Sequence, residues 1–241
     1  MESAGLHFQR FEFKYILNAS SAQSILDTLL KHQLEWDPYV RNIATKDYTV
    51  RTLYYDTPNW RCYYEKLAGI SNRFKLRARV YGEKPSGDVF FELKRRQDSV
   101  IIKDRLQIAW SDFKNMESLS HLSKYSGTQA LRDEMIMREQ QGPFRPRFLV
   151  QYQRQALVGK FQDRLRVTFD RQLTYASATS LDYDGPMEMM NPNLVVMEIK
   201  FNNSLPVWFK DIIQKHNLSR TSFSKYCELL SACQSKHKVL N

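Results

Sequence analysis

The chain of 241 residues carries 36 lysines and arginines against 26 aspartates and glutamates, a formal net charge of +10. With 42% hydrophobic and 13% aromatic residues, its composition is that of a folded globular protein and excludes a disordered one. Three cysteines without a Cys-x-x-Cys pair indicate neither a disulfide framework nor a structural zinc site, and no window resembles a membrane-spanning helix. We therefore expect a cytoplasmic protein that binds anions.

Alternation of apolar and charged residues with a period of two dominates the chain and predicts β-strands. Eight such segments follow one another, at residues 7–17, 47–56, 71–82, 88–97, 100–110, 146–157, 163–175 and 193–203. Helical spacing occurs at about 21–34 behind Ser20 and Ser21, from Asp56-Thr57-Pro58 onward, and at about 111–141, 206–217 and 223–234. No flexible linker or repeat divides the chain, so we expect one domain over residues 1–241 with a mainly antiparallel sheet.

In six strands one face is charged and the opposite face is apolar, as in the segment Arg-Phe-Glu-Phe-Lys-Tyr at 10–15. A single strand with one solvated face would look the same, but a solvated face normally mixes neutral polar residues with both charge signs. Here lysine and arginine dominate, and adjacent like charges repel each other unless an anion compensates them. If the sheet closes on itself, the charged side chains share one lumen, a basic tunnel suited to a linear polyanion.

Three glutamates, Glu12, Glu92 and Glu198, lie among these cations. Carboxylates in a phosphate site usually hold Mg²⁺ or Mn²⁺, whereas the alternative for each is a salt bridge to a neighbouring lysine or arginine. The two readings are equally good for Glu12 and Glu92, and the apolar run VVMEIKF around Glu198 favours metal binding. The chain has no glycine-rich phosphate loop and no nucleophile motif, so direct phosphoryl transfer by positioning and charge fits best. Aromatic residues alternate away from the cations, which argues against a nucleic-acid partner.

Nine short motifs occur in the order typical of one family. They are Arg10-Phe-Glu12-Phe-Lys14-Tyr15, Leu53-Tyr54-Tyr55-Asp56-Thr57, Leu76-Arg77-Ala-Arg79-Val-Tyr81-Gly82, Phe91-Glu92-Leu-Lys94, Lys103-Asp-Arg105, Tyr152-Gln-Arg154-Gln-Ala156, Arg166-Val-Thr-Phe-Asp170, Glu198-Ile-Lys200 and Ser222-Phe-Ser-Lys225-Tyr226. With this set the chain resembles the VTC domain, the polyphosphate polymerase domain of the vacuolar transporter chaperone complex and its bacterial relatives, within the CYTH or triphosphate tunnel metalloenzyme superfamily.

The resemblance implies a mainly β fold, an eight-stranded antiparallel β-barrel tunnel with flanking helices. It also implies a divalent cation, Mn²⁺ or Mg²⁺, and transfer of the ATP γ-phosphate onto a growing polyphosphate chain. Glu198 corresponds to the metal-binding carboxylate, with Glu12 and Glu92 as further metal candidates. The residues we assign to catalysis are Lys94, Arg77, Arg79 and Lys225. Those we assign to substrate binding are Arg10, Lys14, Lys103, Arg105, Arg154, Arg166, Lys200 and Ser224.

Two positions depart from the family pattern. Arg10 stands where hydrolytic relatives have the first glutamate of Glu-x-Glu-x-Lys, which argues against that branch, and Ser222 stands where the eukaryotic polymerase has a lysine. The alternatives are a triphosphatase that hydrolyses tripolyphosphate or a nucleoside triphosphate, and a non-catalytic module that binds polyphosphate or inositol phosphate. The expected partners are ATP and inorganic polyphosphate, and a separate membrane protein could export the product.

Overall fold

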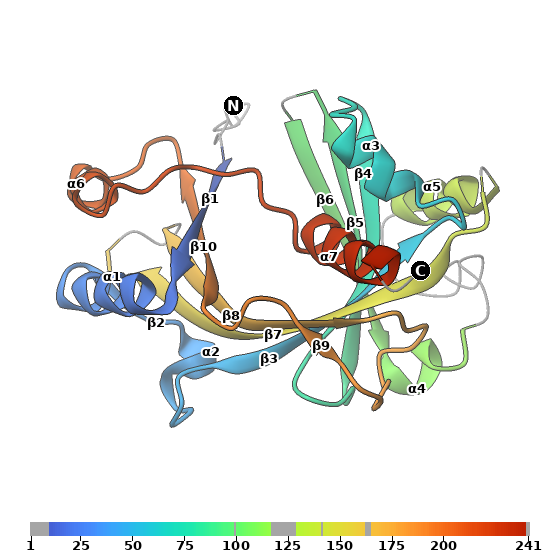
Figure 1. Cartoon of the computed structure of the whole chain (residues 1–241), viewed down its shortest axis with the longest axis horizontal. Helices are drawn as coiled ribbons and strands as arrows, with labels where there is room; N and C mark the ends of the chain where they lie inside the picture. The colour runs from blue at the N-terminus through green and yellow to red at the C-terminus, as the bar shows by residue number, and fades with distance from the viewer. Residues whose placement is uncertain (1–9, 99, 117–128, 141, 162–164, 240–241) are drawn as a thin grey trace, which may run out of the picture. The chain divides into compact units, whose positions relative to one another are not determined.

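The computed structural model describes residues 10–98, 100–116, 129–140, 142–161 and 165–239 (Figure 1). Its elements in chain order are β1 (Arg10–Asn18), α1 (Ala19–Lys31), β2 (Leu34–Trp36), α2 (Pro38–Arg41), β3 (Tyr48–Asp56), α3 (Arg61–Leu67), β4 (Arg73–Tyr81), β5 (Asp88–Gln97), β6 (Val100–Ala109), α4 (Trp110–Phe113), α5 (Gln129–Gln140), β7 (Arg145–Gly159), β8 (Arg166–Ala176), β9 (Glu188–Met189), β10 (Leu194–Asn202), α6 (Val207–Lys215) and α7 (Lys225–Val239).

The long strands form one hydrogen-bonded sheet in the order β1-β10-β8-β7-β3-β4-β5-β6, and the short strands β2 and β9 pair with β7 and β8. The pairs β1–β10, β10–β8, β3–β4, β4–β5 and β5–β6 are all antiparallel. Each of the eight segments predicted from alternation contributes one strand to this order. The prediction of a mainly β, antiparallel fold with flanking helices is therefore confirmed.

The chain divides into two compact units. Unit 1 comprises Met1–Tyr48, Gln153–Leu173 and Asn191–Phe223, and unit 2 comprises Thr49–Tyr152, Thr174–Met190 and Ser224–Asn241. The strands β7 and β8 contribute residues to both units, so the chain passes between them several times. Both units contain buried apolar residues and strands with a charged face. The assignment of residues 1–241 to a single domain stays a prediction.

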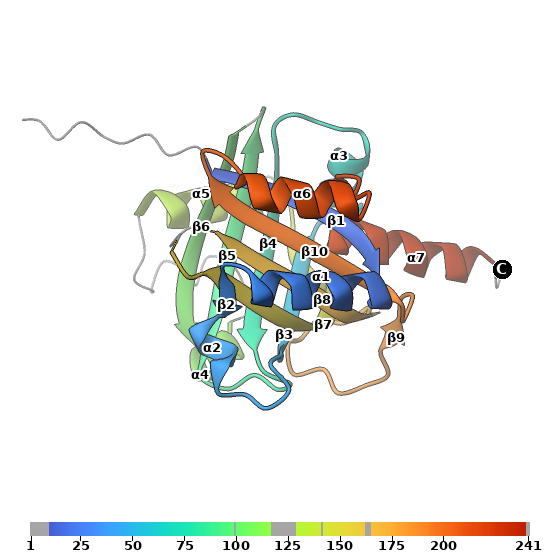
Figure 2. The ribbon, with the colours of Figure 1, turned by 90° about the vertical axis from the view of Figure 1, so that its left-hand side faces the viewer.

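The core of unit 1 lies between helices and one face of the sheet. Figure 2 shows α1 and α6 lying across the strands β10 and β8. Tyr15 and Met197 from the strands are buried in one cluster with Ile25 of α1 and Phe209 of α6. Because successive strand residues point to opposite faces, burial of these odd-numbered positions directs the even-numbered charged positions to the other face.

The local start of α1 differs from the prediction. Asn18 is the N-cap, and its side-chain oxygen accepts a hydrogen bond from the Ser21 N–H at 2.8 Å, so the serines that were expected to cap the helix follow the cap. The helix ends at Lys31, and residues 34–36 form β2 instead of continuing the helix.

In unit 2, Asp56 joins two helices that are distant in the sequence. Its fully buried carboxylate accepts hydrogen bonds from the N–H groups of Cys62 at 2.9 Å and Tyr63 at 3.2 Å, and from the Tyr226 hydroxyl at 2.5 Å. Asp56 therefore satisfies the first turn of α3 and fixes the start of α7. The predicted helix after Asp56-Thr57-Pro58 begins at Arg61, three residues later than its proline suggested.

The other predicted helices are present with shifted bounds. The region 111–141 contains α4 and α5, with 117–128 and 141 outside the described residues, and the last two predicted helices correspond to α6 and α7. The elements that the sequence did not predict are α2, β2 and β9, which are too short to show a period. In the part of the chain that is described, no helix has the length and apolar character needed to cross a membrane.

Candidate functional site

On β4, β5 and β6 of unit 2, the strand register places cations directly opposite one another. Lys75 pairs with Lys94 and Lys94 pairs with Lys103, so three lysines lie in one row across three strands. The adjacent row on the same face combines two arginines with a glutamate: Arg77, Glu92 and Arg105. Because like charges that face each other across strands are destabilising, the lysine row favours a negatively charged ligand.

Glu92 is fully buried at the centre of the second row. One carboxylate oxygen lies 2.7 Å from Arg77 Nη2 and 3.9 Å from Arg79 Nη1, and the other lies 2.5 Å from Lys103 Nζ and 2.6 Å from Arg105 Nη2. Burial would raise the pKa of Glu92, but the cations together outweigh it and hold the pKa well below its usual range. Within this Glu92 cluster, one negative charge against four positive charges leaves a surplus of three.

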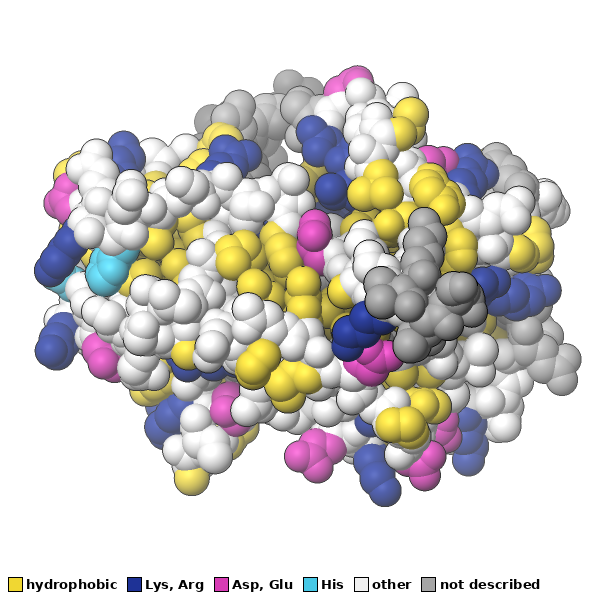
Figure 3. All heavy atoms as spheres, in the orientation of Figure 1, with side chains coloured by type: hydrophobic (Ala, Val, Ile, Leu, Met, Phe, Trp, Pro, Cys, Tyr) yellow, Lys and Arg dark blue, Asp and Glu magenta, His cyan; other side chains and the backbone are white. Residues whose placement is uncertain are grey.

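The solvent-exposed cations of the Glu92 cluster lie on β6. The side chains of Lys103 and Arg105 are 38% and 40% exposed, whereas those of Arg77 and Arg79 are 18% and 8% exposed. Burial lowers the pKa of Lys103 to about 8, although Glu92 acts in the opposite direction. Figure 3 shows a group of Lys and Arg side chains over the ends of these strands. This face can therefore receive an anion from solvent.

The start of α7 adds further cations to the charged face of unit 2. Lys75 Nζ donates a hydrogen bond to Ser224 Oγ at 2.6 Å, and Lys225 Nζ lies 4.8 Å from the centre of the Tyr152 ring. Burial would raise the pKa of the Tyr54 hydroxyl, but Arg77, Arg79, Lys75 and Lys225 act together to lower it. Four cations from β4 and the start of α7 therefore act on this one buried phenol.

Unit 1 presents a second charged face, in which cations and carboxylates alternate. Register gives the rows Glu12–Lys200–Arg166 and Lys14–Glu198–Thr168 across β1, β10 and β8. Lys14 Nζ lies 3.2 Å from Glu12 and 3.8 Å from Glu198, and it donates to the Phe223 carbonyl at 3.2 Å. Lys200 Nζ lies 2.5 Å from the other Glu198 oxygen. Salt bridges, the alternative to metal binding, are therefore formed by both glutamates.

The residues of this face also fit a divalent cation. Thr168 is 4% exposed and lies opposite Glu198 in the strand register. Its hydroxyl is buried and has no hydrogen-bond partner among the described residues. The described residues contain no group of three or more His, Cys, Asp or Glu that could hold a metal. Mg²⁺, however, is usually bound by one or two carboxylates together with water and substrate phosphates. The carboxylates of Glu12 and Glu198 match that donor set, with the Thr168 hydroxyl opposite Glu198 as a further oxygen, whereas the four cations around Glu92 favour its role as a counter-charge.

The remaining predicted residues of unit 1 are ion-paired or only partly described. Arg154 makes two parallel hydrogen bonds to the fully buried Asp170, at 2.6 and 2.8 Å, and Arg166 lies 3.1 Å from Asp37. The backbone of Arg10 pairs with Asn202, and its side chain lies outside the described residues.

The structure thus collects the predicted site residues into two groups. Unit 1 contains Glu12, Lys14, Arg154, Arg166, Glu198 and Lys200, and unit 2 contains Arg77, Arg79, Glu92, Lys94, Lys103, Arg105, Ser224 and Lys225. One tunnel shared by both groups stays a prediction. Lys75, Thr168 and Asp170 were not assigned as site residues, although each continues the period-two series of its strand and could have been found in that way.

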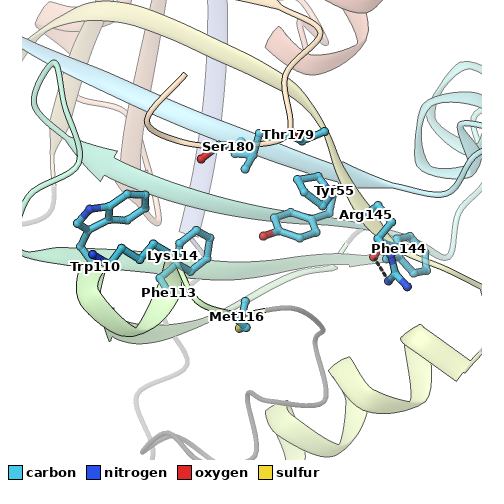
Figure 4. Close-up of a pocket in the computed structure, with 11 residues that line it drawn as sticks. Tyr55, Trp110, Phe113, Lys114, Met116, Phe144, Arg145, Thr179 and Ser180 are labelled. Carbon is cyan, nitrogen blue, oxygen red and sulfur yellow. Dashed lines mark hydrogen bonds between the residues drawn. The ribbon is translucent and has the colours of Figure 1, made fainter. Parts of the chain in front are cut away.

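A cavity of about 420 Å³ in unit 2 is not part of this charged face. Its lining includes Leu53 and Tyr55 of β3, with Trp110, Phe113 and Phe144 from neighbouring segments (Figure 4). On β3 these odd-numbered positions point away from Tyr54, which is the register partner of Arg77. The cavity therefore opens on the face of β3 opposite to the cations.

The sequence also matches a known family. The model of the VTC domain matches residues 9–233, nearly the whole chain. The chain belongs to the VTC domain family. Among curated proteins no significant match is found.

Two solved structures are similar to this VTC domain. A protein from Bacillus halodurans described as a candidate adenylate cyclase has a TM-score of 0.51 and 12% identity, and the match covers 88% of this chain and 92% of that one. A candidate adenylyl cyclase from Hippeastrum, described as having a dominant triphosphatase activity, has a TM-score of 0.51 and 16% identity over 92% of this chain and 96% of that one. At these identities the likeness concerns the fold alone.

Proposed function

We propose that this VTC domain is a metal-dependent polyphosphate polymerase that transfers the γ-phosphate of ATP onto a growing polyphosphate chain in a basic tunnel. The observation that carries this proposal is the row of three lysines, which lies beside a cluster in which four further cations converge on the single carboxylate of Glu92. A chain of phosphates would pair with these cations along the strands, whereas a compact neutral substrate would gain little from them.

The reaction needs no protein nucleophile. An oxygen of the acceptor's terminal phosphate attacks the γ-phosphorus of ATP, the bond from that phosphorus to the β–γ bridging oxygen breaks, and ADP leaves. The protein supplies positioning and charge for the phosphate oxygens. Arg77 and Arg105 are held in fixed orientations by Glu92 and can each donate paired N–H bonds to phosphate, while Lys94 and Lys75 act as point charges.

Two groups of residues, one in each unit, have separate candidate roles. Lys75 of β4, together with Ser224 and Lys225 at the start of α7, would bind a terminal phosphate. On the other charged face, Glu12, Glu198 and Thr168 would hold Mn²⁺ or Mg²⁺, which when bound neutralises phosphate oxygens. Lys14, which contacts both carboxylates, keeps them apart and oriented. We place this activity in the cytoplasm, where ATP is available, and a separate membrane protein would export the product.

A triphosphatase is the second candidate. It is favoured by the fold shared with the Hippeastrum protein, for which a dominant triphosphatase activity is described. The same cations would bind the phosphates, and water would replace the acceptor phosphate. A non-catalytic polyphosphate or inositol-phosphate module would bind through these residues without turnover.

One experiment separates the three functions. The purified protein is incubated with ATP and Mn²⁺ or Mg²⁺, and the products are followed by gel electrophoresis and phosphorus NMR. A polymerase forms ADP and long-chain polyphosphate, a triphosphatase forms orthophosphate, and a binding module forms neither while tripolyphosphate still raises its melting temperature. Lys94→Ala should abolish turnover, and Lys31→Ala, at an exposed position of α1, is the matched control.

A further inference from the structure

The charged face of β4 and β5 becomes aromatic at one end. Along β4 the cations end at Arg79, and the next position on the same face is Tyr81. Along β5 the position before Glu92 on that face is Phe90, which pairs with Arg79 on one side and with Gln107 of β6 on the other. The two aromatic side chains are partly exposed. They are exceptions to the pattern in which aromatic residues alternate away from the cations.

The aromatic pair is combined with a planar cation. The ring centres of Tyr81 and Phe90 are 5.6 Å apart with an angle of 59° between the rings, and the guanidinium carbon of Arg105 lies 4.6 Å from the Phe90 ring centre. Burial would raise the pKa of the Tyr81 hydroxyl, but Arg79 and Arg105 outweigh it and lower the pKa. Aromatic rings and guanidinium planes are the groups on which proteins stack nucleobases.

We propose that Tyr81, Phe90 and Arg105 form the nucleobase subsite for the ATP donor, an inference that rests on the proposed function. Alternate residues of a strand are about 6.6–6.8 Å apart, so the same-face series Arg77, Arg79 and Tyr81 covers about 13 Å. The triphosphate then lies along the arginines toward the Glu92 cluster, and the base lies on the aromatic pair.

The proposed subsite distinguishes the two phosphate substrates. Inorganic polyphosphate has no base and uses the cations alone, whereas a nucleoside triphosphate uses both the cations and the aromatic pair. Beside Phe90, the exposed Gln107 Nε2 donates to Asp88 Oδ2 at 2.6 Å, which offers a donor and an acceptor to the edge of a base. Because every base has a π face, the stacking itself accepts all nucleoside triphosphates.

The test compares ATP with tripolyphosphate on Phe90→Leu and Tyr81→Leu, using calorimetry at equal ionic strength. Each substitution keeps an apolar side chain and removes the π face. ATP affinity should fall roughly 5- to 150-fold, the equivalent of the ~1–3 kcal/mol that stacking of one base contributes, while tripolyphosphate affinity stays unchanged. Tyr64→Leu, at a tyrosine of unit 2 that is 54% exposed, is the control and should alter neither affinity. Thermal melts verify that each variant is folded.

Two results would overturn the subsite. Equal losses for ATP and tripolyphosphate would mean that the aromatic pair only orients Arg79 and Arg105, and unchanged ATP affinity would mean that the rings only pack against each other. The two proposals also fail separately. Wild-type protein that makes polyphosphate while both variants keep full ATP affinity overturns the subsite alone, whereas wild-type protein that binds neither ATP nor tripolyphosphate overturns the proposed function as well.

Discussion

Substituting Glu92 by glutamine removes the carboxylate on which four cations converge and keeps the shape of the side chain. Arg77 and Arg79, with side chains 18% and 8% exposed, would then be buried charges without compensation. Removing one partner of a buried ion pair costs about 3–5 kcal/mol, whereas exposed pairs contribute about 0–1 kcal/mol. Since Lys103 and Arg105 are 38% and 40% exposed, their share is small. We expect Glu92→Gln to lower the free energy of unfolding by about 3–5 kcal/mol.

The assay is urea unfolding followed by circular dichroism, with and without tripolyphosphate. An anion at 100 times its dissociation constant stabilises the folded state by about 2.7 kcal/mol, so tripolyphosphate should restore much of the loss in Glu92→Gln, more strongly at low salt. Glu35→Gln is the matched control, because Glu35 is 43% exposed and pairs with Arg41 at 2.8 Å on the surface. That control should lose no more than about 1 kcal/mol and should respond to tripolyphosphate as the wild type does.

Either of two results would refute the reasoning. A Glu92→Gln protein as stable as the wild type without any anion would show that the carboxylate is not needed as a counter-charge. If Glu92→Gln is less stable than the wild type only when Mn²⁺ is present, Glu92 is a metal ligand.

Three further predictions concern pH, metal binding and the start of α7. With a pKa of about 8 in the folded protein, Lys103 loses its charge at a lower pH than an ordinary lysine, so affinity for tripolyphosphate should fall by up to about tenfold per pH unit above pH 8. Between about pH 8 and 10.5 Lys103 is protonated in the unfolded state and neutral in the folded state, so the free energy of unfolding should rise with pH in this range. Lys103→Arg should flatten the pH dependence of tripolyphosphate affinity, measured by calorimetry, and that of the free energy of unfolding, measured by urea titration. Glu198→Gln should weaken Mn²⁺ binding measured by electron paramagnetic resonance and abolish turnover while polyphosphate binding persists; full activity with normal stability would show the metal assignment to be wrong. Asp56→Asn should destabilise the protein by about 1.5–3 kcal/mol in urea titrations, because its charged oxygens accept the Tyr226 hydroxyl and the first N–H groups of α3, whereas Asp27→Asn on the exposed side of α1 should not.

The strands and their charged faces could be predicted because alternation is a local property. In the segment around Lys75, Arg77 and Arg79, each side chain's face follows from its position alone, since successive strand residues point to opposite sides. The same rule marks Glu198 and Lys200 on β10. Short elements such as β2 and the exact start of α3 could not be predicted, because caps and tertiary contacts decide them.

The roles of the individual charges depend on contacts between distant segments. In sequence Glu92 could not be told apart from Glu12, yet the register of β4, β5 and β6 surrounds it with four cations. The register of β10 and β8 places Glu198 opposite Thr168, whose hydroxyl has no hydrogen-bond partner among the described residues. Lys75 meets Ser224 across 149 residues of chain.

The sequence by itself determined that this chain is an antiparallel sheet with a basic face, because hydrophobic periodicity and net charge are carried by each segment without its neighbours. Only the tertiary structure decided which cations surround each glutamate, and where the cations give way to Tyr81 and Phe90. The physical reason is that Coulomb and hydrogen-bond energies depend on distance and burial, and strand register sets both between residues that the chain separates.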